Sequence, residues 1–208
     1  MGRTSKAPLQ LQEALIQLIW TKCYSAVTID AICEAANVKK GSFYHFYDSK
    51  SALAVDAFDH HWETESRPFL DQAFSASRPP NERFQALLQA DFEIAASQKE
   101  ELGQILGCPF CNIGQEISTL EPEVAAKINE MLDRFRGYLT SALRDAIAQG
   151  LTDISNPEET SLAIYNFLHG SFAQARIQNS LTPIQNLPEN IGRLAGLELA
   201  PLELAIPA

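Results

Sequence analysis

Two short runs of the chain contain side chains that could do chemistry. Residues 39 to 45 read Lys-Lys-Gly-Ser-Phe-Tyr-His and combine ammonium groups, hydroxyls and aromatic rings. Ammonium and hydroxyl groups bind phosphate oxygens, and Tyr and His side chains can reach phosphates or base edges. Residues 107 to 112 read Gly-Cys-Pro-Phe-Cys-Asn and place two thiols three residues apart. The first run therefore indicates nucleic-acid binding, and the second indicates thiol chemistry.

Two predicted helices joined by a tight turn would position the first run. Thr28 can cap the earlier helix by accepting a hydrogen bond from a free backbone N–H. Asn37 stands at the turn, where its tolerance of the left-handed conformation is useful. In the later helix Phe43 and Phe46 are expected to pack inward, which leaves the polar side chains outside. Lys50 falls in the first turn of a further helix and is expected to reach another phosphate.

The run resembles a known DNA-binding motif. The residues concerned are Thr28-Ile29-Asp30-Ala31-Ile32, Ala35-Ala36-Asn37-Val38, Lys40-Gly41-Ser42-Phe43-Tyr44-His45-Phe46 and Ser49-Lys50, with Leu53. They resemble the helix-turn-helix of the TetR (tetracycline-repressor) family of bacterial transcriptional regulators, and residues 9 to 24 would be that family's first helix. Two positions depart from the family pattern: Cys23 stands where Gly is common, and Ser51 stands where Glu is common.

The resemblance implies an all-α protein with two domains. Residues 1 to 51 would be a three-helix DNA-binding domain, and residues 52 to 208 a helical domain for ligand binding and dimerisation. Phosphate contacts are expected from Thr28, Lys39, Lys40 and Lys50, base contacts from Ser42, Tyr44 and His45, and close backbone approach at Gly41. The partners would be double-stranded operator DNA, a second copy of the chain and a small effector.

The distribution of charge fits this division. The whole chain has a net charge of −10, yet residues 1 to 50 contain six basic and four acidic residues. The other ten basic and twenty-two acidic residues all lie beyond residue 50. Repulsion between the acidic body and DNA would orient the basic end toward the duplex.

Breakers divide the rest of the chain into helices. No stretch alternates apolar and polar residues well enough for a sheet. The expected helices cover residues 52–74, 80–97, a short segment starting near 108, 122–150, 156–180 and 188–197. Asn156 followed by Pro157 is a strong start signal, because Asn caps a helix and Pro suits its first position.

The helix expected at 156–180 is the candidate dimerisation element. It mixes large apolar residues with small ones, which let a partner helix approach closely. The resemblance implies that the last two long helices pack into a four-helix bundle in a homodimer; the alternative is that this face only closes the monomer core. The candidate interface residues are Leu162, Phe167, Gly170 and Phe172.

A small-molecule cavity among the middle helices is also implied by the resemblance. Its aromatic content suits an apolar or aromatic effector, although any helical core is lined in this way. The candidate pocket residues are Phe84, Leu88, Phe92, Cys108, Phe110, Cys111, Phe135, Tyr138, Tyr165 and His169.

The two thiols suggest a hypothesis of their own. A helix N-terminus stabilises thiolate, so Cys108 and Cys111 could form a disulfide or capture an electrophile and release DNA. The alternative is that both are small buried apolar residues. No metal site is expected, because two further ligands would be needed and His60, His61 and His169 are distant in sequence.

An enzyme is the competing class of function. Cys-Pro-Phe-Cys is superficially similar to a thiol oxidoreductase site, but that chemistry normally uses a βαβ scaffold. Phosphate-binding glycine loops and nucleophile elbows are absent from the sequence, so no catalytic residue and no cofactor is expected. The N-terminus lacks a signal-peptide core, no apolar run reaches membrane-span length, and the four cysteines suit a reducing compartment, which together indicate the cytoplasm.

Overall fold

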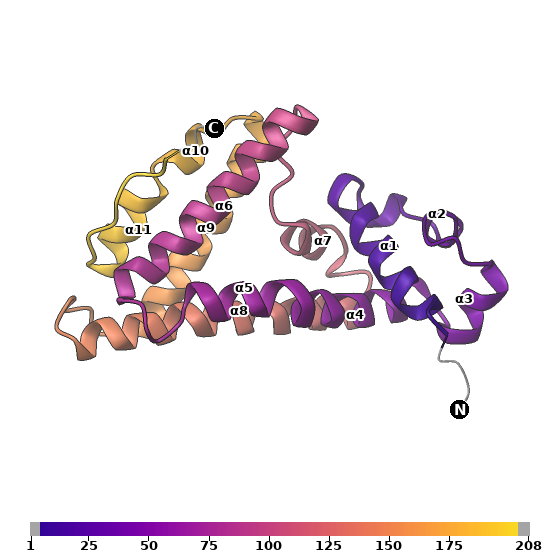
Figure 1. The fold of residues 1–208 in the computed structure, drawn as a ribbon, viewed down its shortest axis with the longest axis horizontal. Coiled ribbons are helices and arrows are strands. Elements are labelled where there is room, and N and C mark those ends of the chain that lie inside the picture. The colour runs from indigo at the N-terminus through magenta and orange to yellow at the C-terminus, as the bar shows by residue number, and fades with distance from the viewer. Residues whose placement is uncertain (1–4, 204–208) are drawn as a thin grey trace. The chain divides into compact units, whose positions relative to one another are not determined.

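The computed structural model describes residues 5 to 203. The described residues form helices joined by turns and contain no β-strand, which confirms the all-α prediction (Figure 1). None of the helices in this part of the chain combines the length and apolar character needed to span a lipid bilayer.

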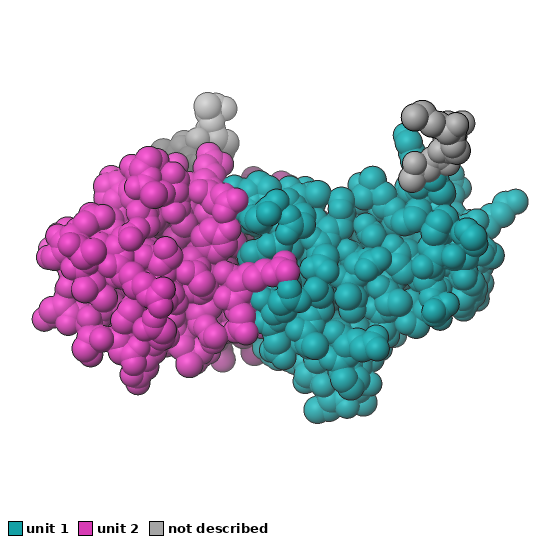
Figure 2. Space-filling view, turned by 90° about the horizontal axis from the view of Figure 1, so that it is seen from below, with its two compact units in different colours: residues 1–68, 109–131 teal, residues 69–108, 132–208 magenta. Residues whose placement is uncertain are grey.

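The contacts divide the chain into two compact units, coloured in Figure 2. Unit 1 comprises residues 1–68 and 109–131, and unit 2 comprises residues 69–108 and 132–208. The expected domain boundary after residue 51 therefore does not coincide with the division by contacts, because residues 109–131 belong to unit 1 although they are distant in sequence. The boundary between functional domains stays a prediction.

Unit 1 is built around the N-terminal helices. Helix α1 packs against α2, α3 and α4, and α7 packs against η1. The elements are α1 (Ala7–Thr21), η1 (Tyr24–Ala26), α2 (Ile29–Ala35), α3 (Lys40–Phe46), α4 (Lys50–His61), the π-helical turn η2 (Trp62–Ser66) and α7 (Pro109–Ile117). The long helix α8 (Pro122–Ala148) begins in this unit and ends in unit 2.

Unit 2 is a second helical body. Helix α9 packs against α10 and α11, and α11 also packs against α6. The elements are α5 (Arg67–Ala73), α6 (Pro80–Leu102), α9 (Pro157–Gln178), α10 (Thr182–Gln185) and α11 (Leu187–Ala195). The buried guanidinium of Arg83 in α6 donates to the carbonyl of Arg78 at 2.9 Å and pairs with Asp145 of α8 at 2.5 Å.

Local signals placed most helix ends correctly. Asn156 caps α9 by accepting from the N–H of Glu159 at 3.1 Å, and Pro157 takes the first helical position, as predicted. The short helix expected near residue 108 begins at Pro109, and the predicted start at Pro122 is likewise confirmed. The helix expected over 52–74 is instead three consecutive segments, α4, η2 and α5; α6 extends beyond residue 97, and α10 was not expected.

Candidate functional site

The turn between α2 and α3 follows the predicted chemistry. The Thr28 hydroxyl accepts from the N–H of Ala31 at 3.1 Å and caps α2. Asn37 adopts a positive φ of 52° at the corner. Both features were predicted from the sequence and both are confirmed. The corner at Asn37 sets the direction in which α3 leaves α2, and thus which face of α3 meets solvent.

Two aromatic residues anchor α3 on unit 1. Phe43 is fully buried, with its ring 6.0 Å from that of Tyr47. The Tyr47 hydroxyl accepts from the Gln12 amide of α1 at 2.9 Å. The expectation that Phe46 also packs inward is wrong, since 37% of it is exposed. Three residues along a helix turn a side chain by about 300°, so Phe46 lies at the edge of the buried stripe that Phe43 centres.

The opposite face of α3 presents the polar residues that the sequence singled out. Tyr44 is 51% exposed, and its ring packs edge-on against Phe43 at 5.2 Å. Apart from the backbone of α3 itself, no atom of residues 5 to 203 lies within 4 Å of the position that a side chain on Gly41 would occupy, so the backbone there is open to a partner. The exposed members of the set are Lys39, Lys40, Gly41, Tyr44 and His45, and Ser42 is half-buried. The structure therefore gathers five of the eight predicted DNA contacts at the accessible N-cap and along α3, together with the partly covered Ser42.

Lys40 is held by a partner on α2. Its ammonium lies 2.7 Å from the Asp30 carboxylate, and both side chains are exposed. The hydrogen bond from Lys40 to Asp30 raises the pKa of the Lys40 ammonium, so this side chain stays charged at physiological pH. Exposed ion pairs contribute little to stability. Replacing Asp30 by a DNA phosphate as the partner of Lys40 should therefore cost little free energy.

Lys50 lies differently from the expectation of a phosphate contact. Its ammonium donates to the carbonyls of Tyr24 at 2.8 Å and Val27 at 3.0 Å, and lies 3.9 Å from the centre of the Tyr24 ring. Burial lowers the pKa of Lys50, with the nearby Glu121 and Glu116 acting against that shift. The geometry gives Lys50 a structural part, which is to hold η1 against α4.

Two acidic residues complete this arrangement, and the sequence reasoning missed both. The Glu116 carboxylate of α7 accepts from the backbone N–H groups of Tyr24 and Ser25, each at 2.9 Å. Glu121, just before α8, accepts from the Tyr24 hydroxyl at 3.1 Å and the Ser51 hydroxyl at 2.7 Å. More than ninety residues separate Glu116 and Glu121 from η1, so no local pattern could reveal the contacts. The one available signal was Ser51, which departs from the family pattern and donates to Glu121.

The pKa of Glu116 is lowered and that of Tyr24 is raised, and both directions suit the hydrogen bonds that these groups make around η1. Burial acts to raise the pKa of Glu116, but hydrogen bonds from Ser25 and Tyr24 and the charge of Lys50 outweigh it and hold the pKa below its usual range. Burial and the neighbouring Glu121 raise the pKa of the Tyr24 phenol. At neutral pH, α7 therefore offers η1 an ionised carboxylate, and Tyr24 offers Glu121 a neutral hydroxyl donor.

The predicted pocket residues lie in different parts of the protein. Phe84, Leu88 and Phe92 of α6 are buried core residues of unit 2. Phe110 belongs to unit 1, where its ring packs against Phe58 at 5.2 Å and His61 at 5.2 Å.

A ring cluster of unit 2 contains three of the other pocket candidates. The rings of Tyr165 and His169 on α9 are 4.2 Å apart, and Phe135 of α8 lies 6.2 Å and 6.3 Å from them. Tyr138 donates to Asp71 at 2.5 Å. Burial lowers the pKa of His169 to about 4, so its imidazole is neutral at physiological pH.

Asp91 of α6 is a residue that sequence reasoning did not select. It is half-buried, and this burial raises the pKa of its carboxyl to about 7. The signal was present in the sequence, because Asp91 follows Phe84, Leu87 and Leu88 at helical spacing on the buried face of α6. A carboxyl with a pKa near neutrality on a core-facing helix surface is a functional-site candidate.

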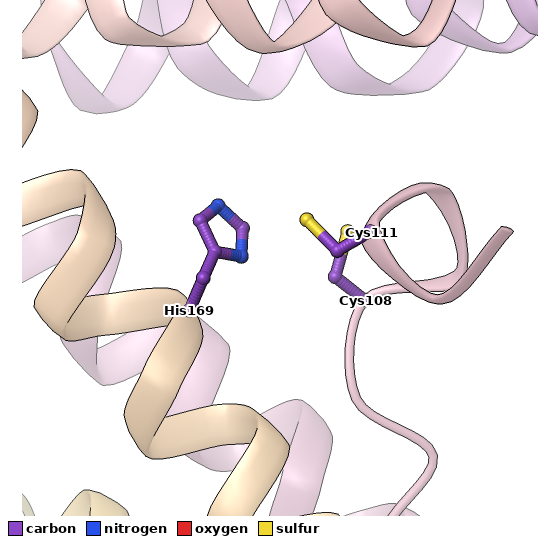
Figure 3. A group of neighbouring side chains, drawn as sticks. All are labelled: Cys108, Cys111 and His169. Carbon is purple, nitrogen blue, oxygen red and sulfur yellow. The ribbon is translucent and has the colours of Figure 1, made fainter. Parts of the chain in front are cut away.

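The thiols and one histidine come together, as Figure 3 shows. Cys108 and His169 both belong to unit 2, and the Cys108 sulfur lies within 4.8 Å of a His169 ring nitrogen. The Cys111 sulfur, three residues further along the chain, is also within 4.8 Å of the Cys108 sulfur. All three side chains are half-buried. His169 was a candidate ligand distant in sequence, and α9 places it beside the Cys108 thiol.

The candidate dimer face of α9 is accessible along its length. Leu162 and Phe167 are large apolar residues that are exposed, and Gly170 is exposed as well. Phe172 is half-buried. Near the end of the helix Ile177 is 76% exposed. Three large apolar side chains of α9, those of Leu162, Phe167 and Ile177, are therefore in contact with water in the single chain.

Comparisons with known proteins agree with this geometry. Residues 11–57 match the family model of bacterial regulatory proteins of the tetR family, and residues 80–189 match the model of the tetracyclin repressor-like C-terminal domain. The first match covers the helices from within α1 to within α4 that present the Lys39 to His45 face. The second covers most of the helical body, including α6, α8 and α9.

Curated relatives and solved structures are also similar to the chain. It is 28% identical over 191 residues to the transcriptional regulator AcuR of Cereibacter sphaeroides, covering 91% of this chain and 85% of AcuR. It is 23% identical over 171 residues to the transcriptional repressor NemR of Escherichia coli (strain K12), covering 82% and 84%.

Among solved structures, the regulatory protein TetR from Rhodobacter sphaeroides has a TM-score of 0.78 and 27% identity, covering 91% of this chain and 99% of that one. Reduced Escherichia coli NemR has a TM-score of 0.79 at 22% identity, covering 91% and 98%, and shares the fold. The matched family models, the helix-turn-helix geometry and these relatives all indicate the same family. The chain belongs to the TetR family and is a DNA-binding transcriptional regulator.

Proposed function

We propose that this regulator is a homodimeric repressor that binds a palindromic operator through α3 and is released by a small effector. The exposed side chains within residues 39 to 45, namely those of Lys39, Lys40, Tyr44 and His45, are the observation that supports the DNA-binding mode most directly. Lys39 and Lys40 would bind phosphates, while Tyr44 and His45 would lie near base edges in the major groove. Such a protein acts in the cytoplasm, where its DNA is, and as a regulator rather than an enzyme.

The exposed large apolar side chains of α9 support a dimer. Leu162, Phe167 and Ile177 would lose contact with water if the same face of a second copy covered them. A two-fold dimer then places two α3 helices on adjacent half-sites, which is how helix-turn-helix proteins gain specificity. The effector would act in unit 2, where Phe135, Tyr165 and His169 form a half-buried aromatic cluster that suits an apolar or aromatic molecule.

Lys40→Ala tests the phosphate contact. The variant should weaken binding to operator and random DNA alike, and it should flatten the dependence of log affinity on log salt by about one unit. Fluorescence anisotropy over a series of salt concentrations measures both quantities.

The matched control is Asp30→Ala, which removes the partner of Lys40 but keeps the cation. It should bind DNA at least as well as the unchanged protein. A loss confined to the operator in Lys40→Ala would instead assign Lys40 to base recognition and contradict the phosphate role.

A second route of release is supported by the short distance between the thiols of Cys108 and Cys111. Diamide would take two electrons and two protons from them, forming a disulfide while the diazene is reduced to the hydrazine. We expect diamide to release the protein from operator DNA, and the double variant Cys108→Ser with Cys111→Ser to resist release. Cys23→Ser, which alters an exposed thiol elsewhere, is the control and should respond normally. If the double variant is released as readily as the unchanged protein, these thiols are not the switch.

A further inference from the structure

Three soft ligand groups converge beside the first turn of α7 (Figure 3). Cys108 precedes that turn, Cys111 lies in it, and His169 comes from the middle of α9. The Cys108 sulfur is within 4.8 Å of both the Cys111 sulfur and a His169 ring nitrogen. A pair of thiols three residues apart with an imidazole at this distance is a frequent arrangement in metal centres, where Cys and His supply sulfur and nitrogen ligands.

The distances are compatible with coordination after small side-chain movements. Zinc binds sulfur at about 2.3 Å and imidazole nitrogen at about 2.0–2.1 Å, so ligand atoms in a tetrahedral site are separated by roughly 3.3–3.8 Å. The present upper limit of 4.8 Å requires a contraction of about 1 Å. Rotation about χ1 of the cysteines moves their sulfur atoms by more than this without changing the backbone.

The chemistry of the donors selects the class of cation. Two sulfurs and one neutral imidazole suit thiophilic metals, whereas calcium and magnesium require oxygen ligands, and none belongs to this group. His169 is half-buried, and imidazole nitrogen is among the ligands that zinc-class cations bind in proteins. The aromatic rings of Tyr165 and Phe135 beside it limit access of water on that side.

We propose that Cys108, Cys111 and His169 bind one thiophilic divalent cation of the zinc class. Three protein ligands leave the fourth tetrahedral position to water or to an anionic or thiol group of another molecule, as in other open zinc sites. The binding site itself does not depend on the repressor role. A regulatory consequence would rest on that role, because Cys111 belongs to α7, the helix whose Glu116 holds η1.

Metal binding is measured directly on the full chain. The protein, reduced with a phosphine and stripped with a chelator, is titrated with Co²⁺ and then with Zn²⁺. We expect one Co²⁺ per chain, a thiolate-to-cobalt charge-transfer band in the near ultraviolet, tetrahedral d–d bands in the visible, and displacement of both by Zn²⁺. Absence of the charge-transfer band, or octahedral d–d bands alone, would overturn the proposal.

Single variants assign the ligands. Cys108→Ser, Cys111→Ser and His169→Gln should each weaken Zn²⁺ binding by more than the 10- to 100-fold that loss of an outer-shell partner costs. Cys23→Ser and His60→Gln, at positions outside the group, should bind like the unchanged protein. Far-ultraviolet circular dichroism verifies that each variant is folded. A His169→Gln protein that binds Zn²⁺ with unchanged affinity would overturn the three-ligand site.

A second readout does not depend on the variants. In the folded, unchanged protein, Zn²⁺ should slow alkylation of Cys108 and Cys111 and leave that of the exposed Cys23 unchanged, as mass spectrometry of the labelled peptides reports. Equal protection of all three cysteines would contradict the proposal. Neither measurement involves DNA, so failure of the metal site and failure of the repressor function are distinguishable.

Discussion

Phe43→Ala should destabilise the helix-turn-helix more than any other single change on α3. Phe43 is fully buried between α3 and the rest of unit 1, and truncating a buried Phe to Ala costs about 3–5 kcal/mol of unfolding free energy. That loss is a large part of the stability of a small domain. We expect operator binding to fall by at least 100-fold, because α3 would no longer be held at a fixed angle. Denaturant unfolding and anisotropy on operator DNA measure the two effects.

Phe46→Ala is the matched control for this prediction. The residue is the same type in the same helix, but it is 37% exposed, so its truncation removes less buried apolar area and should cost clearly less unfolding free energy than Phe43→Ala. Phe43→Leu should recover most of the stability lost in Phe43→Ala, because it refills most of the cavity. If Phe43→Ala unfolds at the same denaturant concentration as Phe46→Ala, the buried anchor assigned to Phe43 is wrong.

Glu116→Ala should weaken the helix-turn-helix from a position about ninety residues away in sequence. The carboxylate of Glu116 accepts two backbone N–H groups of η1, and its loss leaves both without their acceptor. Removing a charged acceptor of this kind costs roughly 1.5–3 kcal/mol, and we expect about 2 kcal/mol because the site is only half-buried. Since η1 leads directly into the Thr28 cap of α2, operator affinity should fall about tenfold, equivalent to 1.4 kcal/mol.

The loss of stability in Glu116→Ala should depend on pH in a way that identifies the carboxylate as its cause. The folded-state pKa of Glu116 is lowered, so its contribution to stability is fully present above the ordinary glutamate pKa of 4.5 and is lost as the pH falls through the folded-state pKa. The stability difference between Glu116→Ala and the unchanged protein should therefore be full at pH 7 and disappear in acid. Glu123→Ala, which alters an exposed glutamate in the first turn of α8, is the control; it should cost no more than the ~0.3–1 kcal/mol of a charge at a helix N-terminus and leave operator affinity unchanged. Equal melting temperatures of Glu116→Ala and Glu123→Ala at pH 7 would contradict the role of Glu116.

Some of the features on which these predictions depend could be predicted from signals a few residues apart, and others could not. The cap at Thr28, the corner at Asn37 and the start of α9 at Asn156 were predictable because each depends on residues at most a few positions apart. Helical periodicity placed Phe43 inside but could not decide the side of Phe46, which lies at the edge of the buried stripe. A stripe edge is set by the shape of the neighbouring helix, and sequence periodicity contains no information on that shape.

Lys50 shows the same limit for a charged residue. Its type and its place at the start of α4 indicated a phosphate contact, whereas its ammonium lies on the carbonyls of Tyr24 and Val27. A basic residue binds whichever acceptors the fold brings near it. For Lys50 these acceptors are the carbonyls of Tyr24 in η1 and of Val27 just after it, and η1 is itself held by Glu116 of a distant helix.

The sequence by itself determined the all-α class, most helix ends, the helix-turn-helix and the basic face of α3, because these depend on capping, turn geometry and spacing over a few residues. Only the tertiary structure decided that α7 and the start of α8 join the DNA-binding helices in unit 1, that Glu116 and Glu121 hold η1, and that His169 lies beside Cys108. The physical reason is that pairings between residues sixty or more positions apart follow from how whole helices pack, and packing depends on the shapes of both partners at once.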